Sequence, residues 1–226
     1  MEKRRLECAK CPVKDKICLS PDGRGPAFCP TLHRKEWVEK ANKEYVKPDI
    51  LKFAHEASIQ EAECYINRNV KPYILHPVKP RIQEICEFAR KMDYKKLGLA
   101  FCSGLPGEAF SCSQILEAQG FEVVSVACKA GATPKEHIGI KDDEKVRIGQ
   151  FESMCSPIAQ AIIFNEEKTD FNILVGLCVG HDSLFLKYSK AYCTVLVAKD
   201  RVLGHNPCAA LYTSSSYYAR MLRKGF

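Results

Sequence analysis

Four short apolar runs lie between residues 96 and 198, and segments with helical patterns separate them. The runs are residues 96–102, 121–128, 171–178 and 192–198. Strands that alternate with helices in this way are typical of a mostly parallel sheet with right-handed crossovers. The runs are apolar almost throughout, as in strands that helices cover on both faces. We therefore expect an α/β fold with a parallel, doubly wound sheet of the Rossmann or flavodoxin type.

Apolar periodicity also predicts the helices. One helical region should cover residues 33–62, with a break or kink at Pro48, and another helix should cover 81–92. Further helices are expected within residues 103–120, 156–165, 181–191 and 206–224. The first 32 residues show no periodicity. The sequence thus predicts a cysteine-rich module at 1–32, a helical connector at 33–95 and an α/β domain at 96–226.

Thirteen of the 226 residues are cysteines, an odd number that excludes complete internal disulfide pairing. The N-terminus has no apolar stretch typical of a secretory signal, and no window is long and apolar enough to span a membrane. We therefore expect a cytoplasmic protein with reduced thiols, in which cysteines serve metal binding or redox chemistry. Cys64 and Cys86 lie in helical patterns and are expected to be simply buried.

The formal net charge is +7, from 34 basic and 27 acidic residues. Basic and aromatic residues do not interleave as in a nucleic-acid groove, so no nucleic acid or membrane partner is expected. An acidic redox partner protein or a small anionic ligand is compatible with this charge. The turn Ser103–Gly107 after the first apolar run resembles an anion-binding turn, although it lacks the Gly-x-Gly-x-x-Gly pattern.

The first candidate site is formed by Cys8, Cys11, Cys18 and Cys29, with two, six and ten residues between them. Four thiolates that start with a Cys-x-x-Cys pair suit zinc or an iron–sulfur cluster. The ending Cys29-Pro30 also occurs in bacterial ferredoxins, which favours a four-iron, four-sulfide cluster over zinc. The spacing does not separate a structural metal from one that transfers electrons or senses.

The second candidate site gathers cysteines at strand ends. Cys102, Cys128 and Cys178 end the first three apolar runs. The carboxyl ends of parallel strands share one edge of a sheet, where ligands bind. Cys155 starts the helix of Cys-Ser-Pro, whose N-terminus belongs at the same edge and favours a thiolate.

Three more side chains are expected at this edge: His181, Lys199 and His205. One hypothesis is a second metal cluster held by Cys128, Cys155 and Cys178, with a fourth ligand from Cys102, His181 or Cys208. His181 would bind through a neutral ring nitrogen, with Asp182 or a carbonyl on the other. The alternatives are a nucleophilic or redox thiol without metal, and cysteines that are merely buried.

Several segments also carry a resemblance to a known family. The segments are LECAKCPVKDKIC, ACKAG, FESMCSPIAQA and NILVGLCVGHDSLFLKYSKAYCTVLVAKDRVLGHNPCAALY. The chain resembles an uncharacterised, domain-of-unknown-function family of predicted metal-binding proteins, found mainly in anaerobic bacteria and archaea. The resemblance implies metal binding by the four N-terminal cysteines and an α/β domain. An anaerobic source would favour iron–sulfur over zinc.

The leading functional hypothesis is an iron–sulfur protein for redox and electron transfer. The N-terminal cluster would pass electrons to the strand-end site, which would reduce or bind a small ligand. If the protein is an enzyme, it would be an iron–sulfur oxidoreductase. The alternatives are a non-enzymatic zinc or iron protein and an accessory module of a larger redox enzyme.

Overall fold

The computed structural model describes residues 5–225, so the first four residues of the predicted cysteine-rich module lie outside it. The described residues form two compact units, residues 5–62 and 63–225. In the first unit, η1 (Cys8–Lys10) and α1 (Pro30–His33) are short, and α2 (Lys35–Glu44) and α3 (Pro48–Glu63) follow. Pro48 begins α3, as expected of a residue that fits the first helical turn but interrupts a helix interior.

The first unit has little core. Among its described residues only Cys29 and Gln60 are buried, and α2 buries none of its side chains. Gly25 packs closely on Cys29, since a Cβ at this glycine would lie 3.0 Å from the Cys29 Sγ. Burial of apolar surface therefore contributes little to holding residues 5–29 in place.

The second unit contains a four-stranded parallel sheet with the order β2-β1-β3-β4. Its strands are β1 (Lys96–Phe101), β2 (Glu122–Ala127), β3 (Phe171–Val175) and β4 (Tyr192–Val197). The central strand β3 is buried along its whole length, whereas the edge strands β2 and β4 are partly exposed. The predicted parallel α/β fold is confirmed.

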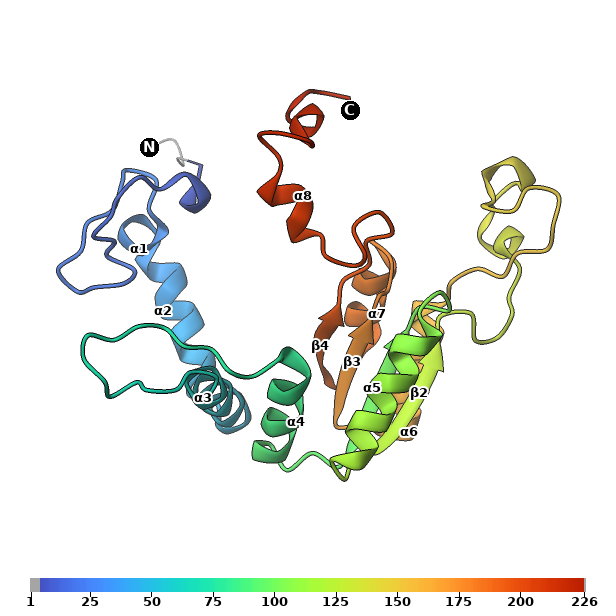
Figure 1. The fold of residues 1–226 in the computed structure, drawn as a ribbon, viewed down its shortest axis with the longest axis horizontal. Helices are drawn as coiled ribbons and strands as arrows, with labels where there is room; N and C mark the ends of the chain where they lie inside the picture. The colour runs from blue at the N-terminus through green and yellow to red at the C-terminus, as the bar shows by residue number, and fades with distance from the viewer. Residues whose placement is uncertain (1–4, 226) are drawn as a thin grey trace. The chain divides into compact units, whose positions relative to one another are not determined.

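Helices lie on both faces of this sheet (Figure 1). The four helices are α4 (Arg81–Lys91), α5 (Pro106–Ala118), α6 (Pro157–Glu167) and α7 (His181–Tyr188). Helix α5 packs on β1 and β2, while α6 packs beside α7 over the core. On the α6–α7 side, Phe164 and Phe185 meet edge to face with ring centroids 5.8 Å apart. Phe88 of α4 contacts Phe171 of β3, so the end of the predicted connector packs against the sheet.

The strand order places the topological switch point between β1 and β3. The chain leaves β1 toward β2 and later returns to β3 on the other side of β1. Gly176 ends β3 with a φ of +66°, and a Cβ there would lie 2.5 Å from the Leu105 Cδ1. Only glycine suits this conformation and this close approach. The crevice beside the switch point is the usual ligand position in such sheets.

The C-terminal segment differs from the sequence prediction. Instead of one helix over 206–224, the structure has a short α8 (Cys208–Tyr212) and a 3₁₀ turn η4 (Ala219–Leu222). The Thr213 hydroxyl donates to the carbonyl of Ala209 (2.7 Å), and three serines follow it. Hydroxyl side chains that bond to nearby backbone compete with helix propagation, which explains the early end.

Candidate thiol site at the carboxyl edge of the sheet

The strand register brings the first two strand-end cysteines side by side. Phe101, the last residue of β1, pairs with Ala127 of β2 and Val175 of β3. The next residues continue the ladder, because the Cys128 N–H donates to Phe101 O (2.8 Å) and the Cys102 N–H donates to Val175 O (3.0 Å). Cys102 and Cys128 therefore extend neighbouring strands at the same level.

Cys128 is the buried member of a set of three cysteines, the thiol row, in which Cys102 and Cys155 pack against the core cluster that contains Cys128. The Cys128 Sγ accepts the Ser103 N–H at 3.3 Å. The Cys128 thiol also shifts the pKa values of Cys102 and Cys155. The structure thus brings together Cys102, Cys128 and Cys155 from three segments that are far apart in sequence.

The Cys128 thiol shifts the pKa values of Cys102 and Cys155 in opposite directions. The hydrogen bond from Cys128 lowers the pKa of Cys155 to about 7, with help from the positive charge of Lys129 and against the effect of burial. The hydrogen bond with Cys128, together with burial, raises the pKa of Cys102 to about 12. At neutral pH the site therefore combines a Cys155 thiolate with a protonated Cys102.

Two backbone and side-chain contacts hold Cys155 beside Cys128. Cys155 directly precedes α6, in which Pro157 occupies the first turn. The Ser156 N–H donates to Cys128 O (2.7 Å), and the Lys129 ammonium donates to Ser153 O. The buried Gln160 lies one turn further along α6. Its side-chain amide donates to the carbonyls of Phe101 (3.2 Å) and Val126 (2.7 Å), which ties α6 to the ends of β1 and β2.

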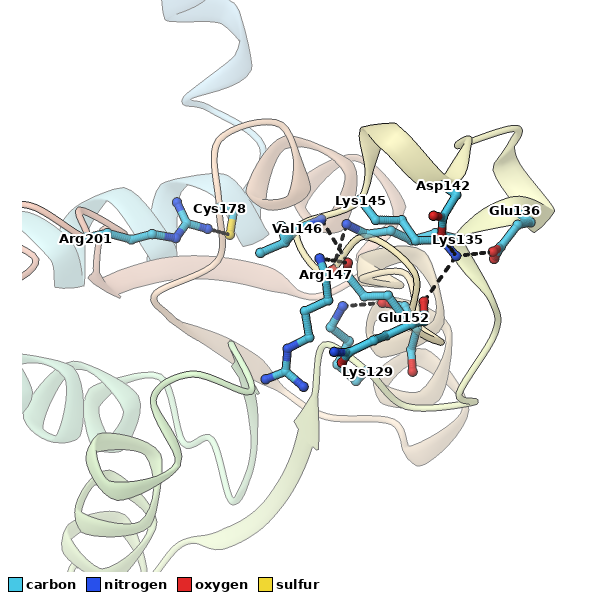
Figure 2. A network of polar contacts seen from close by, with 12 residues as sticks. Lys129, Lys135, Glu136, Asp142, Lys145, Val146, Arg147, Glu152, Cys178 and Arg201 are labelled. Carbon is cyan, nitrogen blue, oxygen red and sulfur yellow. Dashed lines mark hydrogen bonds and ion pairs between the residues drawn. The ribbon is translucent and has the colours of Figure 1, made fainter.

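The loop between Cys128 and Cys155 is held by its own polar network (Figure 2). The Glu152 carboxylate pairs with Lys135 (2.8 Å) and accepts the N–H groups of Val146 and Arg147 (3.0 and 3.1 Å). These contacts, with the Lys135 hydrogen bond first, lower the Glu152 pKa to about 2. The Lys145 side chain is only 5% exposed and pairs with Glu136 and Asp142.

Cys178 and the cationic side chains complete the edge. The half-buried Cys178 lies three residues after β3, and Arg201 donates from Nη2 to its Sγ at 3.0 Å. Figure 2 shows the Arg201 side chain reaching toward Cys178. The Lys199 Nζ and the Cys102 Sγ lie 3.8 and 3.7 Å from the same Cβ position at Gly104. Cys178 is close enough to Cys155 to oppose, weakly, the lowering of its pKa.

The two histidines of the predicted site differ. His181 begins α7 half-buried, and burial together with Lys129 lowers its pKa, which favours the neutral ring. His205 has a φ of +63°, and its Nδ1 accepts the Asp200 N–H (3.1 Å), so it shapes the loop after β4. Cys208 is exposed at the start of α8.

The N-terminal cysteines have a different setting. Cys8 and Cys18 are exposed, Cys11 is half-buried and Cys29 is buried. Across residues 5–225, no group of three or more histidine, cysteine, aspartate or glutamate side chains is arranged to hold a metal ion. Metal binding by either cysteine set stays a prediction.

Two residues that shape the thiol site, Lys129 and Gln160, were not predicted from the sequence. Ser103 was predicted only as part of an anion-binding turn, and not as a donor to Cys128. Lys129 could have been found, because it directly follows Cys128 and a cation next to a cysteine stabilises its thiolate. Nothing in the local pattern of Gln160 marks it, since its role depends on where α6 crosses the strand ends.

The fold and the cysteine row define an α/β protein with a thiol-lined carboxyl edge. The chain belongs to the family described as "Protein of unknown function (DUF1847)", which matches residues 29–196. It is also 44% identical over 192 residues to "Uncharacterized protein MJ0455" of Methanocaldococcus jannaschii, a match that covers 85% of this chain and 91% of that protein. The predicted membership of an uncharacterised family is confirmed.

Two further comparisons concern structure. No solved structure matches the chain. Among residues 5–225, none of the helices combines the length and apolar character needed to cross a bilayer.

Proposed function

We propose that the protein is a redox protein that works through thiol–disulfide exchange at the carboxyl edge of the sheet. Cys155 is the attacking thiolate and Cys128 is the thiol that resolves the intermediate. The single observation that carries the proposal is the hydrogen bond from the Ser156 N–H to Cys128 O (2.7 Å), which holds the segment of Cys155 against the buried Cys128. The neighbouring Cys128 thiol lowers the pKa of Cys155 to about 7. A thiolate with a pKa near ambient pH is the most effective attacking group in such exchange.

The reaction follows from this arrangement. The Cys155 thiolate attacks one sulfur of a disulfide substrate, its S–S bond breaks, and the departing thiolate takes up a proton. The Cys128 thiol then loses its proton and attacks the Cys155 Sγ, which releases the second substrate thiol and leaves a Cys128–Cys155 disulfide. Two electrons pass from the two cysteines to the substrate, and a reducing partner protein would restore the dithiol.

Trapping experiments test this proposal. With a small disulfide, Cys128→Ser should accumulate a mixed disulfide at Cys155, and Cys155→Ser should form none at Cys128. Cys193→Ser is a matched control, because burial raises the pKa of this half-buried thiol away from the row. Peptide mass spectrometry locates the adduct. Equal adduct formation in Cys128→Ser and in the double variant Cys128→Ser/Cys155→Ser would overturn the proposal.

An iron–sulfur cluster on the same edge is the second candidate. One observation favours it: the sulfurs of Cys102, Cys128 and Cys178 receive donors from Gly104 N (3.4 Å), Ser103 N (3.3 Å) and Arg201 (3.0 Å). Donors of this kind stabilise cluster-bound thiolates and tune their potential. With Cys155, these cysteines are the residues that would hold such a cluster, which would supply one-electron transfer.

The N-terminal cysteines offer a second location for an iron–sulfur cluster. Four thiols in a segment with one buried residue suit a metal that substitutes for a core. We propose that Cys8, Cys11, Cys18 and Cys29 bind an iron–sulfur cluster, with zinc as the alternative. A cytoplasmic, anaerobic setting suits both cysteine sites, and so does an accessory role in a larger redox enzyme.

Metal analysis distinguishes the dithiol proposal from the two iron–sulfur proposals. The protein should be purified without oxygen and assayed for iron, acid-labile sulfide and zinc, in wild type, Cys11→Ser and Cys155→Ser. Iron and sulfide lost only in Cys11→Ser would place the cluster in the first unit and leave the dithiol proposal intact. Iron and sulfide lost in Cys155→Ser would assign the sheet edge to a cluster and overturn the dithiol proposal.

A further inference from the structure

The cations beside the thiol row lie next to sulfur or backbone atoms. Arg201 donates to the Cys178 Sγ, Lys129 donates to Ser153 O, and the Lys199 Nζ lies near Cys102, beside Gly104. Within residues 5–225, none of these three side chains forms an ion pair with a carboxylate. Other lysines of the same unit, such as Lys96 and Lys135, do have carboxylate partners.

The carboxylates at this edge are already engaged with backbone. Asp182 Oδ1 accepts the N–H groups of Gly180 (3.0 Å) and Ser183 (2.7 Å) at the start of α7. Asp200 Oδ1 accepts those of Val202 (3.0 Å) and Leu203 (2.8 Å). One oxygen of each carboxylate is thus engaged in its own turn, and within residues 5–225 neither carboxylate pairs with Lys199 or Arg201.

The ammonium of Lys199 lies near the thiol row, since its Nζ and the Cys102 Sγ are 3.8 and 3.7 Å from the same Cβ position at Gly104. Lys199 is half-buried, and a cation removed from water without a counter-charge is costly. An arriving anionic group would gain both the attraction of Lys199 and that of the guanidinium of Arg201, which binds planar carboxylates well.

We propose that the thiol site acts on anionic disulfides, with Lys199 and Arg201 binding carboxylates that flank the scissile S–S bond. This inference rests on the proposed thiol–disulfide function and names its substrate class. Attack by Cys155 would then occur while the carboxylates are held on the β4 side of the edge. The fixed cations would also raise the rate of encounter, most strongly at low ionic strength.

Three small disulfides of different charge test the proposal. They are 5,5′-dithiobis(2-nitrobenzoate), a dianion; 4,4′-dithiodipyridine, which is neutral; and cystamine, a dication. The rate at Cys155 is read by peptide mass spectrometry and divided by the rate of free 2-mercaptoethanol with the same probe. We expect the dianion to be favoured about tenfold over the neutral probe at low salt, with the preference lost at high salt.

Substitutions of Lys199 and Arg201 test whether these two cations cause the preference for the dianion. Lys199→Gln and Arg201→Gln should each lower the rate with the dianion several-fold more than the rate with the neutral probe, while Arg201→Lys should retain most of the preference. Lys190→Gln, at an exposed position after α7, is the matched control. Equal normalised rates for all three probes, or a preference for cystamine, would overturn the anionic substrate class alone. Slow reaction of Cys155 with all three probes would overturn the thiol–disulfide function as well.

Discussion

The two cysteine sets of this chain are built by opposite means. The N-terminal set is close in sequence and lies in a segment where only Cys29 is buried. The sheet-edge set is spread from Cys102 to Cys178, and strand register and a long loop bring it together. The sheet edge is thus assembled by the fold itself, whereas the N-terminal set has little buried structure around it, and its binding of a metal stays a prediction.

The first prediction concerns thiol reactivity within the sheet-edge set, where the largest effect is expected. At neutral pH about half of Cys155 is thiolate, against about 10⁻⁵ of Cys102, whose pKa is about 12. The greater intrinsic nucleophilicity of the more basic thiolate recovers about 10² of this difference. Iodoacetamide should therefore modify Cys155 at least ~10²-fold faster than Cys102.

The alkylation rate of Cys155 should also depend on pH in a definite direction. A thiol reacts as its thiolate, so the Cys155 rate should rise with pH through about 7 and then level off. Quantitative peptide mass spectrometry measures both sites in one sample, and the unfolded protein serves as the control in which the two rates converge. Equal rates in the folded protein would contradict the described hydrogen bonds.

The second prediction tests how far the sheet depends on close packing. Gly98 lies in β1, and a Cβ there would lie 2.1 Å from the Asn172 Oδ1 and 2.8 Å from the Phe164 Cδ2. Gly98→Ala should lower the free energy of unfolding of this unit by about 2 kcal/mol or more. Gly107→Ala in α5 is the control, because no atom lies within 4 Å of its Cβ position. Denaturant unfolding that shows equal stability for both variants would contradict this packing.

The third prediction concerns the N-terminal set. If the four cysteines bind a metal that replaces a core, Cys11→Ser should release it, and residues 5–29 should become about tenfold more sensitive to protease. Cys155 reactivity should not change. Limited proteolysis followed by mass spectrometry measures the cleavage sites. Wild-type metal content in Cys11→Ser would show that this residue is not a ligand.

Much of the α/β domain could be predicted from sequence, because its signals are local. Apolar runs predicted all four strands within three residues of their ends, and Pro48 predicted a break in the helical region, at the point where α3 begins. Topology then predicted that strand-end cysteines share an edge, and the register of Phe101 with Ala127 gives the physical basis for this.

The parts that could not be predicted depend on contacts between distant residues. The ion pair between Glu136 and Lys145 follows no helix or strand period, so the folding of the loop around it was not evident. The opposite pKa shifts of Cys102 and Cys155 require knowing that Cys128 lies between them. The prediction of one helix over residues 206–224 was wrong, because it did not allow for the hydroxyl residues after Tyr212, where α8 ends.

The fourth prediction has the smallest effect and concerns how the loop supports the Cys155 thiolate. The hydrogen bond from Cys128 is the main cause of the lowered pKa, and the charge of Lys129 is a lesser one. Lys129→Gln should therefore move the alkylation profile of Cys155 to higher pH by a fraction of a unit, and Cys128→Ala should move it further. Lys129→Arg keeps the charge and should leave the profile near that of wild type. Because a lost cation destabilises the thiolate and not the thiol, only an upward shift is consistent with this account. A larger shift in Lys129→Gln than in Cys128→Ala would instead make the cation, rather than the neighbouring thiol, the main support of the Cys155 thiolate.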